Sequence, residues 1–273
     1  MNIKSSAIVL FSPTGTSSKV VGAVCDGCRC AARVIDATYT TPDNLEFASD
    51  ALVFVAVPVY GGKVAPLALQ RMEAMRGDKT PVVLIVVYGN RAYEGALSQL
   101  DEFVTQRGFV TVGAAAFVGE HSYSSKEHPI AVGRPDMTDL ADARNFGKEL
   151  ATKLAAITVP RMVDVTRLVP PRDSLWSKLR FIFFILRQRN KKKPATKPAP
   201  VVDMEACKGC GKCARLCPNG AISPDGKHTD AERCIKCCAC VKSCPARARH
   251  FATPYAPILS QCFAARKSPV TIL

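Results

Sequence analysis

The sequence predicts an α/β protein in two parts, a doubly wound parallel sheet of five strands followed by a small α+β domain that contains most of the cysteines. Five apolar runs alternate with helical patterns through the first 157 residues. A run of four cysteines then occurs twice near the C-terminal end. The charge also changes along the chain, because residues 1–160 carry 15 Lys and Arg against 16 Asp and Glu, whereas residues 161–273 carry 22 against 7. Two domains of different character are therefore expected.

The predicted strands are continuous apolar runs rather than alternating ones, which is typical of a parallel sheet buried on both faces. Helical patterns between and after them predict the crossover connections of a doubly wound sheet, with ligands at the carboxyl ends of the strands. The strands are predicted at 7–11, 32–36, 51–57, 81–87 and 109–118, and the clearest helical patterns lie at 65–75, 93–108 and 139–157.

The loop after the first predicted strand, FSPTGTSS, is rich in hydroxyl side chains. Such a loop before a helix directs N–H and O–H donors at one point, where the helix dipole favours an anion. A dinucleotide fingerprint needs three glycines, and this loop has only Gly15, so one phosphate is expected rather than two. The alternative is that Ser12, Thr14, Thr16 and Ser17 only cap the helix.

The two cysteine runs are an internal duplication with a 27-residue step, and each reads C-x2-C-x2-C-x3-C-P. This run binds [4Fe-4S] clusters in bacterial ferredoxins, where three close thiolates hold one cluster and the fourth reaches across to the other. Zinc is the alternative, but zinc sites use paired C-x2-C knuckles. The two expected ligand sets are Cys207, Cys210 and Cys213 with Cys244, and Cys234, Cys237 and Cys240 with Cys217.

Five of the thirteen cysteines fall outside these sets, and the sequence suggests an interpretation for four of them. Cys238 does not have the spacing of a ligand and is interpreted as a packed thiol. Cys25, Cys28 and Cys30 have no fourth ligand nearby and fall where the first helix should end, so they are interpreted as incidental.

Residues 1 to about 157 resemble a flavodoxin and the second half resembles a two-cluster bacterial ferredoxin; together they are similar to the family that fuses the two. The resemblance implies the strand order 2-1-3-4-5 and FMN as the bound mononucleotide. It divides the chain into a flavodoxin-like domain at 1–158, a helix and linker at 159–200, a ferredoxin domain at 201–253 and a C-terminal extension at 254–273. The FMN-binding positions that it implies are Ser12, Thr14, Gly15, Thr16 and Ser17 at the phosphate, and Pro58, Tyr60, Gly61, Gly62, Gly89, Asn90 and Tyr93 around the flavin ring.

The segment 172–193 predicts an amphipathic helix between basic flanks, too short in its apolar core to span a bilayer. Docking against the rest of the protein, a membrane surface or a partner protein would each bury its apolar face. The Lys- and Pro-rich residues 190–200 predict a semi-extended tether. The apolar face consists of Leu175, Trp176, Leu179, Ile182, Phe183 and Leu186.

Function is predicted as an electron relay in which the clusters exchange single electrons and FMN stores one or two. The rival is a flavin-dependent reductase of a small substrate fed by its own clusters, and a third reading makes the clusters structural or sensing elements. Glu120, His121 and Tyr123 follow the fifth strand, and either close the flavin pocket or face the clusters. The N-terminus lacks a signal-peptide pattern, so a cytoplasmic protein is expected. Its basic half favours a redox partner with an acidic surface, while no nucleic-acid motif is present.

Overall fold

The computed structural model describes residues 1–43, 45–191 and 197–273, and it divides into two compact units that interleave along the chain. Residues 192–196 of the predicted tether lie outside the described residues. Unit 1 comprises Met1–Glu120, Gly133–Pro171 and Lys267–Leu273, and unit 2 comprises His121–Val132 and Arg172–Arg266.

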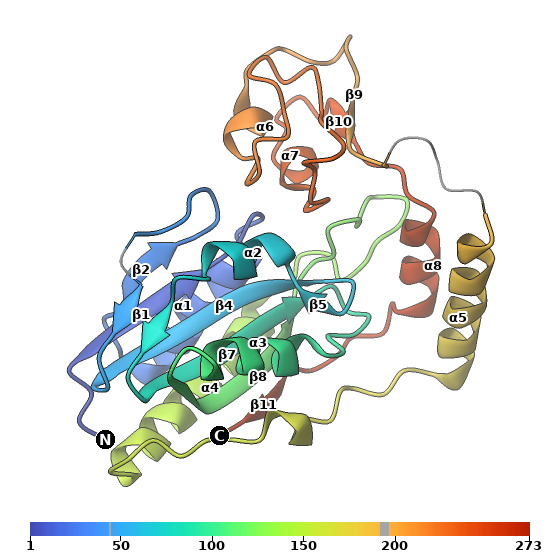
Figure 1. Ribbon diagram of the computed structural model, residues 1–273. Helices are drawn as coiled ribbons and strands as arrows, with labels where there is room; N and C mark the ends of the chain where they lie inside the picture. The colour runs from blue at the N-terminus through green and yellow to red at the C-terminus, as the bar shows by residue number, and fades with distance from the viewer. Residues whose placement is uncertain (44, 192–196) are drawn as a thin grey trace. The chain divides into compact units, whose positions relative to one another are not determined.

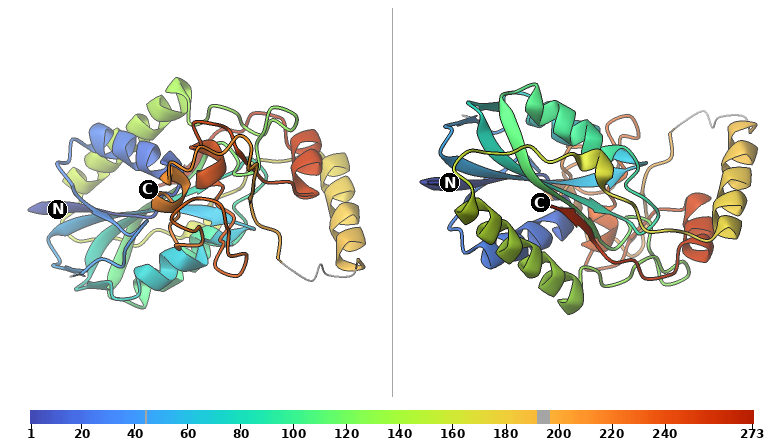
Figure 2. Two further views of the ribbon diagram at one scale, coloured as in Figure 1. Left: turned by 90° about the horizontal axis from the view of Figure 1, so that it is seen from above. Right: turned by 90° about the horizontal axis from the view of Figure 1, so that it is seen from below.

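Unit 1 is an α/β sandwich built on one large sheet (Figure 1). Its helices cover both faces of the sheet, α1 and α4 on one and α2 and α3 on the other (Figure 2). In chain order its elements are β1 (Ser5–Leu10), α1 (Thr16–Cys28), β2 (Arg33–Asp36), β3 (Glu46–Phe47), β4 (Ala51–Tyr60), β5 (Lys63–Val64), α2 (Pro66–Arg71), β6 (Arg76–Gly77), β7 (Thr80–Tyr88), α3 (Ala96–Thr105), β8 (Phe109–Val118), α4 (Met137–Ala156), the 3-10 helix η1 (Val165–Arg167) and β11 (Val270–Ile272).

The five long strands lie in the order β2-β1-β4-β7-β8, all parallel to their neighbours. Counted along the chain, this is the order 2-1-3-4-5 of the flavodoxin-like fold, as predicted. Every residue of the central strand β7 is buried, which explains why its sequence is a continuous apolar run. The reversal of strand order between β1 and β4 places the switch point of the sheet beside the loop that follows β1.

The sheet is larger than the sequence predicted, because β11 pairs antiparallel with β8 at the edge. This strand comes from the C-terminal end of the chain. The pairing joins Val270 to Ala116 and Ile272 to Ala114. A three-residue strand carries too little periodicity to be recognised in the sequence.

Helices α1 and α4 pack so closely that two glycines are required at their contact. A Cβ on Gly27 would lie 2.0 Å from the carbonyl oxygen of Arg144, and a Cβ on Gly147 would lie 2.0 Å from that of Val24. The side chains of these helices and of the strands beneath them form the main core, which includes Phe54, Ile85, Phe117, Phe146 and Leu150.

Unit 2 consists of short elements and loops around the cysteines, with two longer helices. Its elements are α5 (Leu175–Arg189), β9 (Val201–Val202), α6 (Lys212–Arg215), α7 (Ala239–Lys242), β10 (Arg249–His250) and α8 (Tyr255–Cys262). The strands β9 and β10 pair antiparallel.

Helix α5 docks on α8, but not through the apolar face that the sequence predicted. Phe181 and Phe184 make the contact: the Phe181 ring lies 5.3 Å from that of Phe263, and the Phe184 ring lies 5.4 Å from that of Tyr255. The predicted face points away from α8 and all six of its side chains are exposed. None of the described helices has both the length and the apolar character that crossing a membrane requires.

Candidate functional site

The loop between β1 and α1 is a tight turn with hydroxyl groups on it. Gly15 has a left-handed φ of 76°, and its N–H donates to the carbonyl oxygen of Ser12 at 3.0 Å. Thr38, from the loop after β2, accepts a hydrogen bond from the Ser12 N–H at 2.8 Å. The hydroxyl oxygens of Thr14 and Thr16 lie 3.0 Å apart. The turn is therefore held by its backbone and by a neighbouring loop.

The N-terminus of α1 keeps two backbone donors available. Its N-cap residue, Gly15, has no side chain with which to cap the helix, and among the side chains of the described loop only that of Ser12 accepts a helix N–H, that of Ser18 at 3.1 Å. Within the described residues, the N–H groups of Thr16 and Ser17 have no hydrogen-bond partner. Capping thus accounts for only part of this loop. Free donors at the positive end of a helix, beside two threonine hydroxyls, fit one anionic group such as a phosphate.

The chain reverses from β4 into β5 through Gly61 and Gly62, which have φ angles of 62° and 82°. Two left-handed residues in a two-residue hairpin favour glycine. A Cβ on Gly62 would lie 1.9 Å from Glu94 Oε2, so this turn lies against the loop that follows β7. Tyr60 ends β4 opposite Lys63 and is half-buried. The structure therefore brings together two of the three loops that were predicted to bind a cofactor.

The loop after β7 differs from the expectation at Tyr93. Its ring is only 4% exposed and packs edge-to-face on Tyr88 at 5.6 Å, and its hydroxyl donates to the carbonyl oxygen of Leu168 at 3.5 Å. Burial raises the pKa of Tyr93. A ring enclosed in this way supports the loop and has no open face for a ligand ring, whereas Tyr60 remains accessible.

The remaining predicted ring-binding residues lie where the strands end. Pro58 lies in β4 opposite Val87, and Gly89 directly follows β7. Asn90 is buried and has a φ of 63°. All three are therefore at the carboxyl edge of the sheet, as is the phosphate loop after β1.

In unit 2, one cavity is lined by Cys207, Cys210, Cys213 and Cys244. These four cysteines come from both repeats and are the first predicted ligand set. Gly226 also lines the cavity, where an added Cβ would lie 2.9 Å from Cys213 Sγ. The donor set, and the absence of a side chain at Gly226 where the backbone approaches Cys213, fit a [4Fe-4S] cluster.

The second predicted set is also gathered. Cys217 acts electrostatically on Cys234, Cys237 and Cys240, although it lies in the other repeat. Burial raises the pKa of the Cys237 thiol to about 12 and that of the Cys240 thiol to about 11. The pKa of the Cys234 thiol is raised as well, by burial, so a positively charged iron group would help to hold the three thiols of this repeat as thiolates.

The described residues hold no three His, Cys, Asp or Glu side chains that converge as ligands of a single metal ion. A tetrahedral zinc site would bring four ligands to one ion. In a [4Fe-4S] cluster each cysteine binds a different iron, so the four sulfurs surround a larger group.

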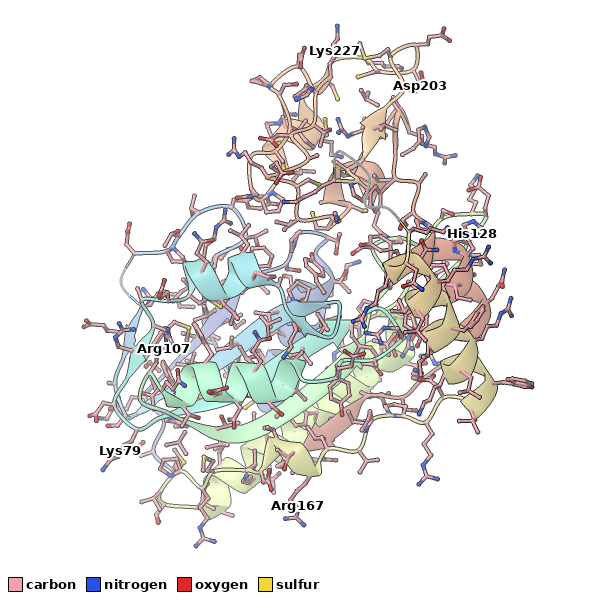
Figure 3. The ribbon with its side chains drawn as sticks, turned by 45° about the vertical axis from the view of Figure 1, so that its right-hand side comes forward. Lys79, Arg107, His128, Arg167, Asp203 and Lys227 are labelled. Carbon is pink, nitrogen blue, oxygen red and sulfur yellow. The ribbon has the colours of Figure 1, made fainter. Side chains whose placement is uncertain are left out.

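The duplication seen in the sequence is repeated in the backbone hydrogen bonds. Each cysteine run begins with an N–H that donates to an aspartate carbonyl, Cys207 to Asp203 at 3.0 Å and Cys234 to Asp230 at 3.1 Å. Asp203 lies at the outer surface of the cysteine-rich part (Figure 3). Equal local geometry at a 27-residue step indicates two equivalent binding loops.

The fourth cysteine of each run accepts a matching hydrogen bond. The Ala221 N–H donates to Cys217 Sγ at 3.2 Å, and the Ala248 N–H donates to Cys244 Sγ at 3.3 Å. Hydrogen bonds to the ligating sulfurs stabilise negative charge and are one of the means by which proteins set cluster potentials.

The surplus Cys238 is explained by the same repeat. It corresponds to Gly211, and both residues precede a short helix with left-handed φ angles, 57° and 67° respectively. The equivalent pair Lys236 and Gly209 shows the same match, 58° and 65°. Cys238 therefore occupies the position of a turn glycine rather than that of a ligand.

Arg249 is a buried cation between the two cysteine sets. It is 2% exposed, lines the cavity of the first set, and its Nη1 lies 3.7 Å from Cys213 Sγ. Its guanidinium also donates to the Cys240 thiol and opposes the rise in the pKa of that thiol that burial causes. The same side chain donates to the carbonyl oxygen of Gly226 at 2.7 Å and to Thr229. Its Nε is buried and has no hydrogen-bond partner within the described structure.

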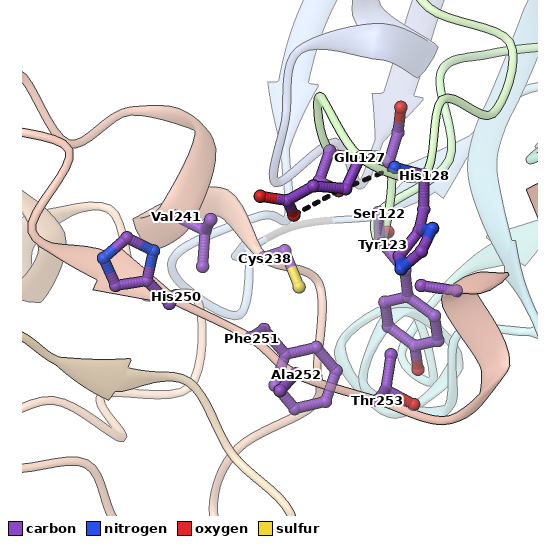
Figure 4. A pocket seen from close by; sticks show the side chains of 13 residues that line it. Ser122, Tyr123, Glu127, His128, Cys238, Val241, His250, Phe251, Ala252 and Thr253 are labelled. Carbon is purple, nitrogen blue, oxygen red and sulfur yellow. Dashed lines mark hydrogen bonds between the residues drawn. The ribbon is translucent and has the colours of Figure 1, made fainter.

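The loop that follows Glu120 belongs to unit 2, and Tyr123 lies beside the cysteines there. The Tyr123 ring is 5.2 Å from that of Phe251. Burial, followed by the charges of Cys238 and other nearby groups, raises the pKa of Tyr123 to about 12. A cavity of about 290 Å³ adjoins these residues, with Cys238 and His250 in its wall (Figure 4). Tyr123 therefore faces the cluster-binding region, which was one of the two expectations for this loop.

The three cysteines at the end of α1 are closer together than expected. Cys25, Cys28 and Ser6 donate hydrogen bonds to Cys30 and lower the pKa of that thiol to about 4. Cys25 is buried, and Cys28 and Cys30 are half-buried against the core. The sequence showed only their spacing.

The strand order of unit 1 and the cysteine sites of unit 2 define an iron–sulfur protein that joins a flavodoxin-like fold to a cluster-binding domain. The comparison with protein families agrees with the cluster-binding part of this description. Residues 200–223 and 228–250 match the model of the 4Fe-4S binding domain. No curated protein was found to match the chain.

Solved structures similar to this chain include several flavodoxins. An archaeal flavodoxin is 14% identical, with a TM-score of 0.37, over 55% of this chain and 99% of its own. The two-electron reduced flavodoxin of Megasphaera elsdenii is 14% identical, with a TM-score of 0.40, over 54% of this chain and 98% of its own. The flavodoxin of Fusobacterium nucleatum, solved with bound flavin mononucleotide, is 13% identical, with a TM-score of 0.37, over 56% of this chain and 98% of its own.

The sequence did not identify Arg249 as a residue of the cluster-binding region. A signal was present, because the equivalent position of the first repeat is Ile222, which is buried. A charged residue at a position that is apolar and buried in the other repeat indicates that this residue has a role other than packing.

Proposed function

We propose that the protein is an electron carrier that relays electrons between two [4Fe-4S] clusters and FMN, and so couples one-electron to two-electron redox partners. Iron–sulfur clusters exchange single electrons, and a flavin supplies storage of one or two. The observation that carries the proposal is the cavity in which Cys207, Cys210 and Cys213 of one repeat meet Cys244 of the other.

For the clusters, the chain supplies ligands, shielding and charge. Cys217 with Cys234, Cys237 and Cys240 would hold the second cluster, as the first set would hold the other. The burial of Cys237 and Cys240, and the backbone N–H groups that donate to the fourth cysteine of each run, favour a stable site. Each of these features tunes a potential without taking part in bond making.

For FMN, the turn after β1 would hold the phosphate. Thr16 and Ser17 offer backbone N–H groups, Thr14 and Thr16 offer hydroxyls, and the dipole of α1 offers a positive end. Gly61 and Gly62 let the backbone approach the ring, and Tyr60 offers an aromatic face. The proposal gives Tyr93 a supporting position under the ring-binding loop.

The physiological partner would be a redox protein with an acidic docking surface. Residues 161–273 carry 22 Lys and Arg against 7 Asp and Glu. Two oxidised clusters with eight thiolates carry about −4, which offsets only part of this surplus. The remaining positive charge would steer an acidic protein to the cluster-bearing unit.

The test is the flavin, iron and sulfide content of protein purified without oxygen, followed by a potentiometric titration. We expect one FMN and about eight iron atoms per chain. The double variant T14V/T16V should lose flavin and keep its iron, whereas the control T105V/T152V, which changes two threonines on α3 and α4, should keep both.

A colourless preparation would contradict the cluster assignment, and full flavin content in T14V/T16V would contradict the phosphate site. Turnover of NAD(P)H with a quinone by the pure protein, without a protein donor, would favour the reductase alternative over a carrier.

A further inference from the structure

Helix α5 presents a large apolar face with nothing packed on it within the described structure. At 100° per residue, six side chains fall within an arc of about 120°. Their exposed fractions run from 48% for Leu179 to 79% for Trp176. The face consists of Leu175, Trp176, Leu179, Ile182, Phe183 and Leu186, and we call it the α5 apolar face.

The opposite side of the helix is the one that unit 2 buries. Phe181 and Phe184 pack with Phe263 and Tyr255. At the edge of this contact the exposed Arg180 donates to Gln261 Oε1 at 2.6 Å. On the helical wheel these two phenylalanines lie about 180° from the centre of the α5 apolar face. The helix is thus fixed in an orientation that keeps the apolar face outward; Figures 1 and 2 show α5 alongside α8.

Cations border the α5 apolar face along both edges. Lys178 and Arg189 lie on one edge, and Arg180 and Arg187 on the other, as their positions on the wheel require. All four side chains are exposed. Over residues 172–191 six Lys or Arg stand against a single acid, Asp173.

We propose that the α5 apolar face docks on the surface of an anionic lipid bilayer. A convex helix with an apolar stripe between two rows of cations matches the layers of such a surface, with acyl chains below and phosphate groups at the level of the Lys and Arg heads. Long cationic side chains reach outward to headgroups while their stems cover the apolar edge. Trp176 has the amphipathic ring that membrane interfaces favour.

Charge disfavours a second copy of this chain as the occupant. Two α5 helices placed face to face would bring the cations of one against those of the other, and like charges across an interface are destabilising. The helix would lie in the interface rather than cross it, since the apolar stripe is one face of a 15-residue helix. The cofactor-loaded protein would then carry its clusters at a membrane surface.

The experiment is vesicle co-sedimentation of the cofactor-loaded full chain. We expect sedimentation with phosphatidylcholine vesicles that contain phosphatidylglycerol, at least about tenfold tighter than with phosphatidylcholine alone, and weaker at high salt. The variant W176S/F183S should stay in the supernatant. The control M137S/V169S removes two apolar side chains that are 76% and 72% exposed elsewhere in the chain, and it should sediment like the parent.

Trp176 is the only tryptophan of the chain, so its fluorescence reports on the face directly. On anionic vesicles its emission should move to shorter wavelength and be quenched by brominated lipid. Because all the altered side chains are exposed, iron content and circular dichroism should be unchanged in both double variants.

Three results would overturn the proposal. One is a protein that stays in the supernatant with anionic vesicles at low salt. The second is equal sedimentation of W176S/F183S and the parent. The third is an emission shift that appears with protein concentration alone, together with a dimer in analytical ultracentrifugation, which would assign the face to a second copy.

Discussion

Replacing Arg249 by Gln should lower the reduction potentials of both clusters. The guanidinium is buried, lies 3.7 Å from Cys213 Sγ and also donates to Cys240, so it contacts one ligand from each set. A fixed positive charge beside the ligands favours the added electron. Gln keeps a polar side chain at this position while removing that charge.

The size of the effect follows from the separation. At an effective dielectric constant of about 20, two unit charges about 5 Å apart interact by about 3.3 kcal/mol. For a one-electron couple about 1.4 kcal/mol corresponds to about 59 mV, so the full interaction is about 140 mV. Because the cluster charge is spread over several sulfurs, we expect each potential to fall by less than this, about 50–130 mV.

The assay is protein-film voltammetry or a redox titration followed by electron paramagnetic resonance, on protein of known iron content. Arg249→Lys keeps the positive charge but loses the several N–H donors of the guanidinium. The cluster potentials should therefore fall less in this variant than in Arg249→Gln. Arg233→Gln removes the same charge from an exposed side chain next to Cys234, and should shift the potentials least because solvent screens it. Unchanged potentials in fully loaded Arg249→Gln would refute the reasoning.

Two further predictions concern unit 2. Gly226→Ala should lose the first cluster, because the added Cβ would lie 2.9 Å from Cys213 Sγ. The iron content should then fall from about eight to about four atoms per chain. The control is Gly209→Ala, at a position with a similar left-handed φ of 65° but with open space for a Cβ; equal iron loss in both variants would assign the effect to backbone strain. The raised pKa of Tyr123, about 12, means that its folded-state phenol stays neutral while the unfolded one ionises near pH 10. The contribution of Tyr123 to the free energy of unfolding is therefore complete below about pH 10. It is lost as the pH rises towards about 12, which lowers that free energy by up to about 2–3 kcal/mol. The unfolding free energy of Tyr123→Phe should fall less over this range than that of the parent, and parallel pH profiles would contradict the assignment.

The sequence by itself determined the features that are repeated or continuous along the chain. The five long strands could be predicted because a strand buried on both faces must be apolar throughout. The grouping of the cysteines from both repeats could be predicted because the C-x2-C-x2-C-x3-C-P spacing occurs twice, and this spacing is typical of cluster-binding loops. The turn after β1 could be predicted because its hydroxyls and Gly15 are adjacent in sequence.

Only the tertiary structure decided features that depend on which residues meet across the fold. It showed α5 docked through Phe181 and Phe184, with the more apolar stripe left outside, and Tyr93 enclosed beneath its loop. It added β11 to the edge of the sheet and placed Arg249 between the cysteine sets. The local sequence pattern of a segment shows its period and polarity. Which face of the segment is buried depends on residues far away in the sequence, because tertiary packing brings them against it.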